Sequence, residues 1–167
     1  MAEQDRIYIE KVKYSGTFDF KELYRFCYDW LVDNGYLVSE KSYGEKVGSS
    51  GKDVEIEWEA KKKISDYFRF VITAKWRILG MTSVDVEKDG KKIGVNKGAF
   101  EITLRGLLEK DYEHRWENNA FTKFLRGVYD RYVIRARIDQ YEGKIFFEVD
   151  ELVAQIKSFL ALEGKKY

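Results

Sequence analysis

Apolar and polar side chains alternate from Asp53 to Ile78, and this alternation constrains the fold more than any other feature of the chain. A side-chain period of two is typical of antiparallel strands that bury one face. The segment is long enough for two such strands joined by a tight turn near residues 63–66, so it predicts a hairpin that forms one wall of an aromatic-rich core. The apolar positions are Val54, Ile56, Trp58, Ala60, Phe68, Phe70, Ile72, Ala74, Trp76 and Ile78.

The polar positions of the same segment carry opposite charges on the two expected strands. The first strand has Asp53, Glu55, Glu57 and Glu59, and the second has Arg69, Lys75 and Arg77. Opposite charges facing each other across an antiparallel pair attract by about 0.2–1 kcal/mol. Because the charges balance locally, a solvated outer face is favoured over a nucleic-acid surface, for the Lys61–Lys63 run as well.

The composition predicts one globular domain spanning residues 1–167, because 44% of the 167 residues are hydrophobic and 35% are charged. The net charge of +1 is small for a protein that binds duplex DNA. No apolar run approaches the roughly 18 residues of a transmembrane helix, and the N-terminus lacks a signal-peptide pattern. The single cysteine, Cys27, cannot form an internal disulfide, so we expect a cytoplasmic protein.

A short strand at 6–14 and a helix at 19–34 with capping signals at both ends precede the expected sheet. Asp19 is placed as the N-cap and Glu22 completes a capping box. Gly35 suits the left-handed position that closes a helix. An antiparallel sheet is then expected over residues 36–109, with a turn at 79–82, separate strands at 83–88 and 91–96 around Asp89-Gly90, and a bulge at Gly106.

A helical tail over 119–162, capped by Asn118 or Asn119, carries two apolar stripes that are out of phase at 3.6 residues per turn. Either a break lies between about residues 135 and 143, or one long helix changes its buried face there. The fold class is therefore α+β, with a twisted antiparallel sheet of about six to seven strands packed on an N-terminal helix and a long C-terminal helical segment.

Catalytic and metal chemistry find little support in the residue types. A functional interpretation makes His114, the only histidine, a general base or a single metal ligand. An exposed residue in a polar connecting segment is favoured instead, because the sequence offers no partner side chains that would complete a site. Cys27 lies on an apolar helix stripe, where burial disfavours a nucleophile that uses His114 as base. One His and one Cys cannot complete a His/Cys zinc site. A phosphate-binding loop needs Ser or Thr after its lysine and then a helix. The Gly48–Lys52 loop is followed by Asp53 and a strand, so it does not match that motif. We expect no catalytic residue, metal or cofactor.

The order strand, helix, about six antiparallel strands and a long C-terminal helical segment resembles the helix-grip fold of the START and Bet v 1 class. The resemblance implies a sheet that wraps the C-terminal helix around an apolar cavity. The chain departs from that class in having one helix where two are usual, and a longer helical tail. The segments FKELYRF, KKISDYFRF and WRILGM resemble small uncharacterised archaeal proteins, which bears on source and compartment only.

This resemblance and the aromatic residues lead to a non-enzymatic function as the first hypothesis, the binding of an apolar small molecule or lipid between sheet and C-terminal helix. Simple packing of a solid core is the competing interpretation of the same rings. A second hypothesis is a protein-interaction or homo-oligomeric assembly module that uses the amphipathic C-terminal helices. The ligand-binding set of the first hypothesis is Trp58, Phe68, Phe70, Trp76, Phe100, Ile102, Phe124 and Val128.

Overall fold

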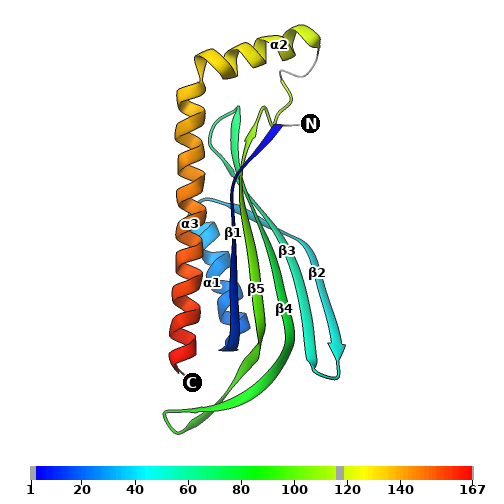
Figure 1. The fold of residues 1–167 in the computed structure, drawn as a ribbon, viewed down its shortest axis with the longest axis vertical. Helices are drawn as coiled ribbons and strands as arrows, with labels where there is room; N and C mark the ends of the chain where they lie inside the picture. The colour runs from blue at the N-terminus through cyan, green and yellow to red at the C-terminus, as the bar shows by residue number, and fades with distance from the viewer. Residues whose placement is uncertain (1–2, 116–118, 167) are drawn as a thin grey trace.

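The protein is described by a computed structural model that covers residues 3–115 and 119–166 (Figure 1). An antiparallel sheet of five strands, in the order β1-β5-β4-β3-β2, packs against helices, so the α+β class is confirmed. The elements in chain order are β1 (Glu3–Phe18), α1 (Phe20–Asp33), β2 (Leu37–Gly48), β3 (Gly51–Lys63), β4 (Phe68–Lys88), β5 (Lys91–Lys110), α2 (Ala120–Val128), the π-helical segment η1 (Tyr129–Val133) and α3 (Arg135–Lys166).

The sheet has five strands rather than six to seven because two expected strands are extensions of their neighbours. The hairpin turn at Asp89-Gly90 is confirmed, with φ of 52° and 75°, but its arms continue β4 and β5. The turn expected at residues 79–82 is a bulge inside β4, where pairing with β5 shifts between Leu79 and Thr82. Gly80 adopts φ +61° and its N–H donates to Asp53 Oδ1 at 2.8 Å, which lets the strand bend without leaving the sheet.

Helix α1 begins and ends where the sequence predicts, but the expected capping box is only half formed, because the Glu22 side chain has no return bond to the Asp19 N–H among the described residues. Asp19 Oδ1 accepts a hydrogen bond from the backbone N–H of Glu22 at 3.0 Å, which confirms the N-cap. Gly35 has φ +86°, and the next residue, Tyr36, donates its backbone N–H to the Leu31 carbonyl at 2.9 Å. This bonding satisfies carbonyls that would otherwise be unpaired at the end of the helix.

Asp19→Ala is expected to lower the free energy of unfolding by about 1 kcal/mol, because the Glu22 N–H loses its acceptor. Urea unfolding followed by circular dichroism measures the change. Asp19→Ser keeps a capping oxygen and is the matched control, expected within about 0.5 kcal/mol of wild type. Equal losses in both variants would contradict the capping role.

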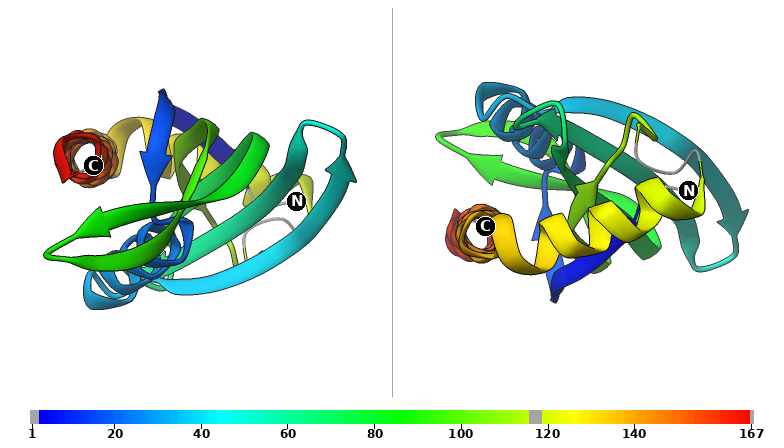
Figure 2. Two further views of the ribbon diagram at one scale, coloured as in Figure 1. Left: turned by 90° about the horizontal axis from the view of Figure 1, so that it is seen from below. Right: turned by 90° about the horizontal axis from the view of Figure 1, so that it is seen from above.

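Helices α1 and α3 cover the same face of the sheet, and α3 runs along its β1 side (Figure 2). Helix α3 packs directly on Gly106 of β5, where an added Cβ would lie 2.9 Å from Val149 Cγ2. The bulge expected at Gly106 lies opposite it, on the neighbouring strand: β1 has an extra residue between Arg6 and Tyr8, which pair with Leu107 and Gly106, while Gly106 itself stays in register with Ile72 of β4. The glycine is required by packing, not by bending.

The helical tail breaks at η1, upstream of the expected 135–143 interval. The Ile134 N–H donates to the Tyr129 carbonyl at 3.1 Å, an i to i+5 bond that widens the helix by one residue. Ile134 then begins the buried stripe of α3, while α2 points away across one end of the molecule (Figure 1). Asn119 caps α2 by accepting from the Thr122 N–H at 2.8 Å, and the alternative cap Asn118 lies outside the described residues.

Candidate functional site

Six residues of the expected ligand-binding set gather inside the sheet–helix interface, and none is more than 4% exposed. The rings of Trp58 and Trp76 have centroids 5.0 Å apart, and the Trp58 ring meets that of Tyr24 in α1 at 4.7 Å. The rings of Phe68 and Phe70 instead meet the Tyr141 ring of α3, at 5.1 and 6.2 Å. Such edge-to-face contacts are those of a packed aromatic core. The six are Trp58, Phe68, Phe70, Trp76, Phe100 and Ile102.

One polar atom of this interior has no hydrogen bond among the described residues, namely Trp76 Nε1. The ring of Phe20 meets the Trp76 ring edge-on, with centroids 6.4 Å apart, and the Phe100 ring lies at 5.8 Å. The other buried polar side-chain atoms among the described residues are hydrogen-bonded.

The other two residues of the expected set, Phe124 and Val128, do not join these six, which corrects the combined set. They lie on α2, where Phe124 is 66% exposed and Val128 is 38% exposed. The physical reason is the break at η1, which turns α2 away from the line of α3 and hence away from the inner face of the sheet (Figure 1). The structure separates a core cluster from a surface helix.

The histidine and the cysteine occupy unrelated environments. His114 is exposed in the segment after β5 and has φ +56°. Cys27 is 2% exposed in α1, and burial raises the pKa of its thiol well above the usual value. A thiol held protonated in the core does not suit nucleophilic chemistry. Among residues 3–115 and 119–166, no group of three or more His, Cys, Asp or Glu side chains is placed to hold a metal ion.

The outer face of the sheet carries the charge pairing expected from the sequence. Glu57 lies 3.5 Å from Lys75 Nζ, and Glu55 lies 3.7 Å from Arg77 Nε. Arg69 is the exception, because it pairs with Glu109 of β5 at 2.5 Å and not with β3. These contacts confirm a face whose charges neutralise one another.

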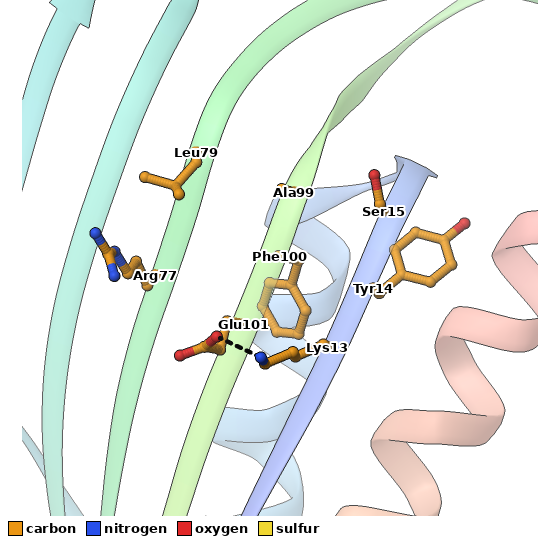
Figure 3. A pocket seen from close by; sticks show the side chains of 8 residues that line it. All are labelled: Lys13, Tyr14, Ser15, Arg77, Leu79, Ala99, Phe100 and Glu101. Atoms are coloured by element: carbon orange, nitrogen blue, oxygen red, sulfur yellow. Dashed lines mark ion pairs between the residues drawn. The ribbon is translucent and has the colours of Figure 1, made fainter.

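A hollow of about 330 Å³ lies on this outer face (Figure 3). Leu79 and Ala99 line it, with Arg77 on one side and the Lys13–Glu101 ion pair, at 3.8 Å, on the other. Arg77 also interacts with Glu55. The charged residues that line the hollow, Lys13, Glu101 and Arg77, all have ion-pair partners within the sheet, so the hollow offers no unpaired charge to a ligand.

Helix α2 is fastened to the body by one of its sides. Arg126 Nη1 lies 3.9 Å from Asp111 Oδ2, and Asp111 is only 2% exposed in the segment that follows β5. The Tyr129 ring, just beyond α2, meets the Tyr67 ring with centroids 6.2 Å apart. Thr122, at the same helical spacing, is also partly covered. The side that faces the body is therefore defined by an ion pair and a tyrosine pair.

The apolar side of α2 faces away from the body. Phe121 is 67% exposed and Phe124 is 66% exposed, and the helix has no buried residue among those described. The apolar residues follow i, i+3, i+4, i+7 spacing, which places them on one side of a helix. We call this set the α2 stripe: Phe121, Phe124, Leu125, Val128 and, in η1, Tyr132.

Packing within the described residues does not account for the exposed α2 stripe, because an apolar helix face is normally buried. Among the described residues, no helix combines the length and apolar character needed to cross a bilayer. No protein-family model, no curated protein and no solved structure matches the chain.

Proposed function

We propose that the protein is a non-enzymatic binding protein that attaches to a lipid surface through the α2 stripe. Lipid was an expected ligand between sheet and helices, and the proposed site is instead on the outside of the molecule. The observation that supports the proposal is the orientation of α2: Arg126 and Tyr129 fasten it to the body, so that Phe121 and Phe124 project into solvent.

Helix α2 resembles a helix that lies in a membrane interface. Such helices combine an apolar side that carries aromatic residues with a polar opposite side, and they bury the apolar side about 5–10 Å deep. Burying one large apolar side chain is worth about 1.5–3 kcal/mol. With Phe121, Phe124 and Tyr132 each more than 60% exposed, transfer of the stripe into lipid removes most of this apolar surface from water.

A second copy of the chain fits the stripe less well. A helix of nine residues is about 14 Å long and about 10 Å wide, so two stripes facing each other cover only a few hundred Å². Stable protein interfaces bury about 1,200 Å² or more. A lipid surface needs no matching groove, and α2 lies across one end of the molecule, where a plane can approach it (Figure 1).

Phe124→Ser is expected to weaken binding to lipid vesicles at least tenfold, because a 66% exposed ring that enters the lipid is lost. Co-sedimentation of the full chain with vesicles of mixed phosphatidylcholine and phosphatidylserine measures the partition. Phe147→Ser is the matched control, since Phe147 is 70% exposed but lies on α3, and it should leave binding unchanged.

Two outcomes would overturn the proposal. One is a wild-type protein that stays in solution with every vesicle. The other is a stable dimer, seen by light scattering at micromolar concentration, that dissociates in Phe124→Ser; the stripe would then be the interface of the assembly-module hypothesis.

A further inference from the structure

We propose that the lipid surface bound by α2 is anionic, and that Lys123 and Arg131 contact its headgroups. This inference rests on the proposed function and names the chemistry of the surface. Its starting point is the sequence from Ala120 to Ile138, which has five basic residues (Lys123, Arg126, Arg131, Arg135 and Arg137) and one acidic residue, Asp130. The segment therefore carries four net positive charges, whereas the whole chain carries +1.

Arg126 is turned toward the body of the molecule, so it is not one of the cations that face solvent. Its side chain is only 11% exposed and lies against the buried Asp111 carboxylate, with Nη1 and Oδ2 3.9 Å apart. Arg126 thus neutralises Asp111 and sets which side of α2 meets the body. It is a positioning residue for the stripe and is not available to a headgroup.

Lys123 and Arg131 are both exposed, and at about 100° per residue Lys123 lies on the side of α2 opposite the stripe, whereas Arg131 lies at its edge. The Arg131 guanidinium carbon lies 5.7 Å from the centroid of the Tyr132 ring, which belongs to the stripe. Long cationic side chains beside an apolar face extend their charged ends toward water while the stems stay on the apolar surface. When the stripe enters lipid, the Arg131 charge therefore lies at the depth of the headgroups. The Lys123 charge lies on the far side of a helix about 10 Å wide, where its long stem reaches the outer headgroups.

These two cations differ from the basic residues on the sheet. On the outer face, Lys11 pairs with Glu101 at 3.1 Å and Lys41 with Glu59 at 3.3 Å. In the part of the chain that the structure describes, neither Lys123 nor Arg131 forms an ion pair. A cation beside an apolar stripe without an acidic partner is complementary to an anionic interface. The same positive charges disfavour contact between two copies of α2, because like charges would meet.

The size of the effect follows from the charge count. Each Lys or Arg close to an anionic membrane surface contributes about 1 kcal/mol, which is about a fivefold change in affinity. Two such residues predict a preference of about 25-fold for anionic over zwitterionic vesicles. The preference should fall as NaCl is raised, since screening shortens the reach of the attraction.

The test compares vesicles of phosphatidylcholine alone with vesicles that also contain phosphatidylserine. The variant Lys123→Gln/Arg131→Gln is expected to lose the 25-fold preference while it keeps its residual binding to phosphatidylcholine. The matched control is Lys91→Gln/Lys92→Gln, which removes the same charge from the exposed β4–β5 hairpin at the opposite end of the molecule (Figure 1). It should retain most of the preference. Thermal unfolding by circular dichroism establishes that both variants are folded.

The outcomes separate this inference from the proposed function. Equal binding of wild type to the two vesicle types would overturn the anionic surface and leave lipid attachment standing. Absence of binding to both would overturn both proposals. An equal loss of preference in the two double variants would assign it to net charge, and would overturn the roles of Lys123 and Arg131.

Discussion

Glu148→Ala is expected to lower the free energy of unfolding by about 2 kcal/mol, because it leaves a partly buried cation and a buried phenol without their shared partner. Lys62 Nζ lies 2.9 Å from Glu148 Oε1, and the Tyr36 hydroxyl donates to the other carboxylate oxygen. Tyr36 is 3% exposed, and burial together with the Glu148 carboxylate raises the pKa of its hydroxyl far above the usual value. The phenol therefore remains a donor, and no water replaces its acceptor at low cost.

Urea unfolding monitored by circular dichroism gives the free energy, with Glu151→Ala as the control on the same helix. Glu151 is exposed, so its loss should change stability by less than about 0.5 kcal/mol. The pair Lys62→Met/Glu148→Leu removes both charges together and is expected to recover only the part of the loss that comes from the unpaired cation, since the Tyr36 hydroxyl still lacks its acceptor. A Glu148→Ala protein as stable as Glu151→Ala would show that the three groups do not form a stabilising network.

The same network bears on the candidate site. Tyr36 follows the end of α1 and Lys62 lies near the end of β3, so Glu148 connects α3 to both. Helix α3 continues from η1 and α2, and its placement on the sheet determines where α2 begins. A weakened α3 contact is therefore expected to disturb the α2 stripe as well, although no residue of the network touches it.

The predictable parts of the fold are those set by local patterns. The alternation from Asp53 to Ile78 predicts β3 and β4 because a period of two leaves one face to bury, and Val54 and Ile78 are both fully buried. The caps of α1 were predictable because Asp19 and Gly35 act on backbone groups within a few residues. Each of these features is decided by neighbours in the sequence.

The orientation of α2 was not predictable from its stripe. The spacing of Phe121, Phe124 and Val128 indicates an amphipathic helix but does not say which side meets the body. That choice depends on Arg126 and Asp111, which come from different segments and pair only in the folded chain. In the sequence, only the phase difference between the two apolar stripes of the tail indicates that one interior does not bury both stripes. The strand count failed for a similar reason, because Gly80 bends β4 through a contact with Asp53 of β3.

Gly106→Val is expected to lower the free energy of unfolding by about 3 kcal/mol, because β5 and α3 touch at this glycine. Even one added carbon would stand 2.9 Å from Val149 Cγ2 and 3.2 Å from Ile145 Cγ1, and both of these side chains are fully buried. Branching at Cβ makes both partners stiff, so the helix must move or the strand must distort. The same urea titration measures the loss.

A double-mutant cycle identifies the contact that is responsible. Gly106→Ala alone should cost about 1–3 kcal/mol, although alanine is otherwise favoured over glycine in a strand by about 0.5–1 kcal/mol. Val149→Ala removes the methyl group that the new Cβ would meet, so the two changes together should cost about 1 kcal/mol less than their sum. Gly44→Ala, at a position in β2 with no neighbouring atom closer than 4.0 Å, should be neutral or slightly stabilising. If Gly106→Ala behaved like Gly44→Ala, α3 would lie farther from β5, and the placement of η1 and α2 that depends on it would have to be revised.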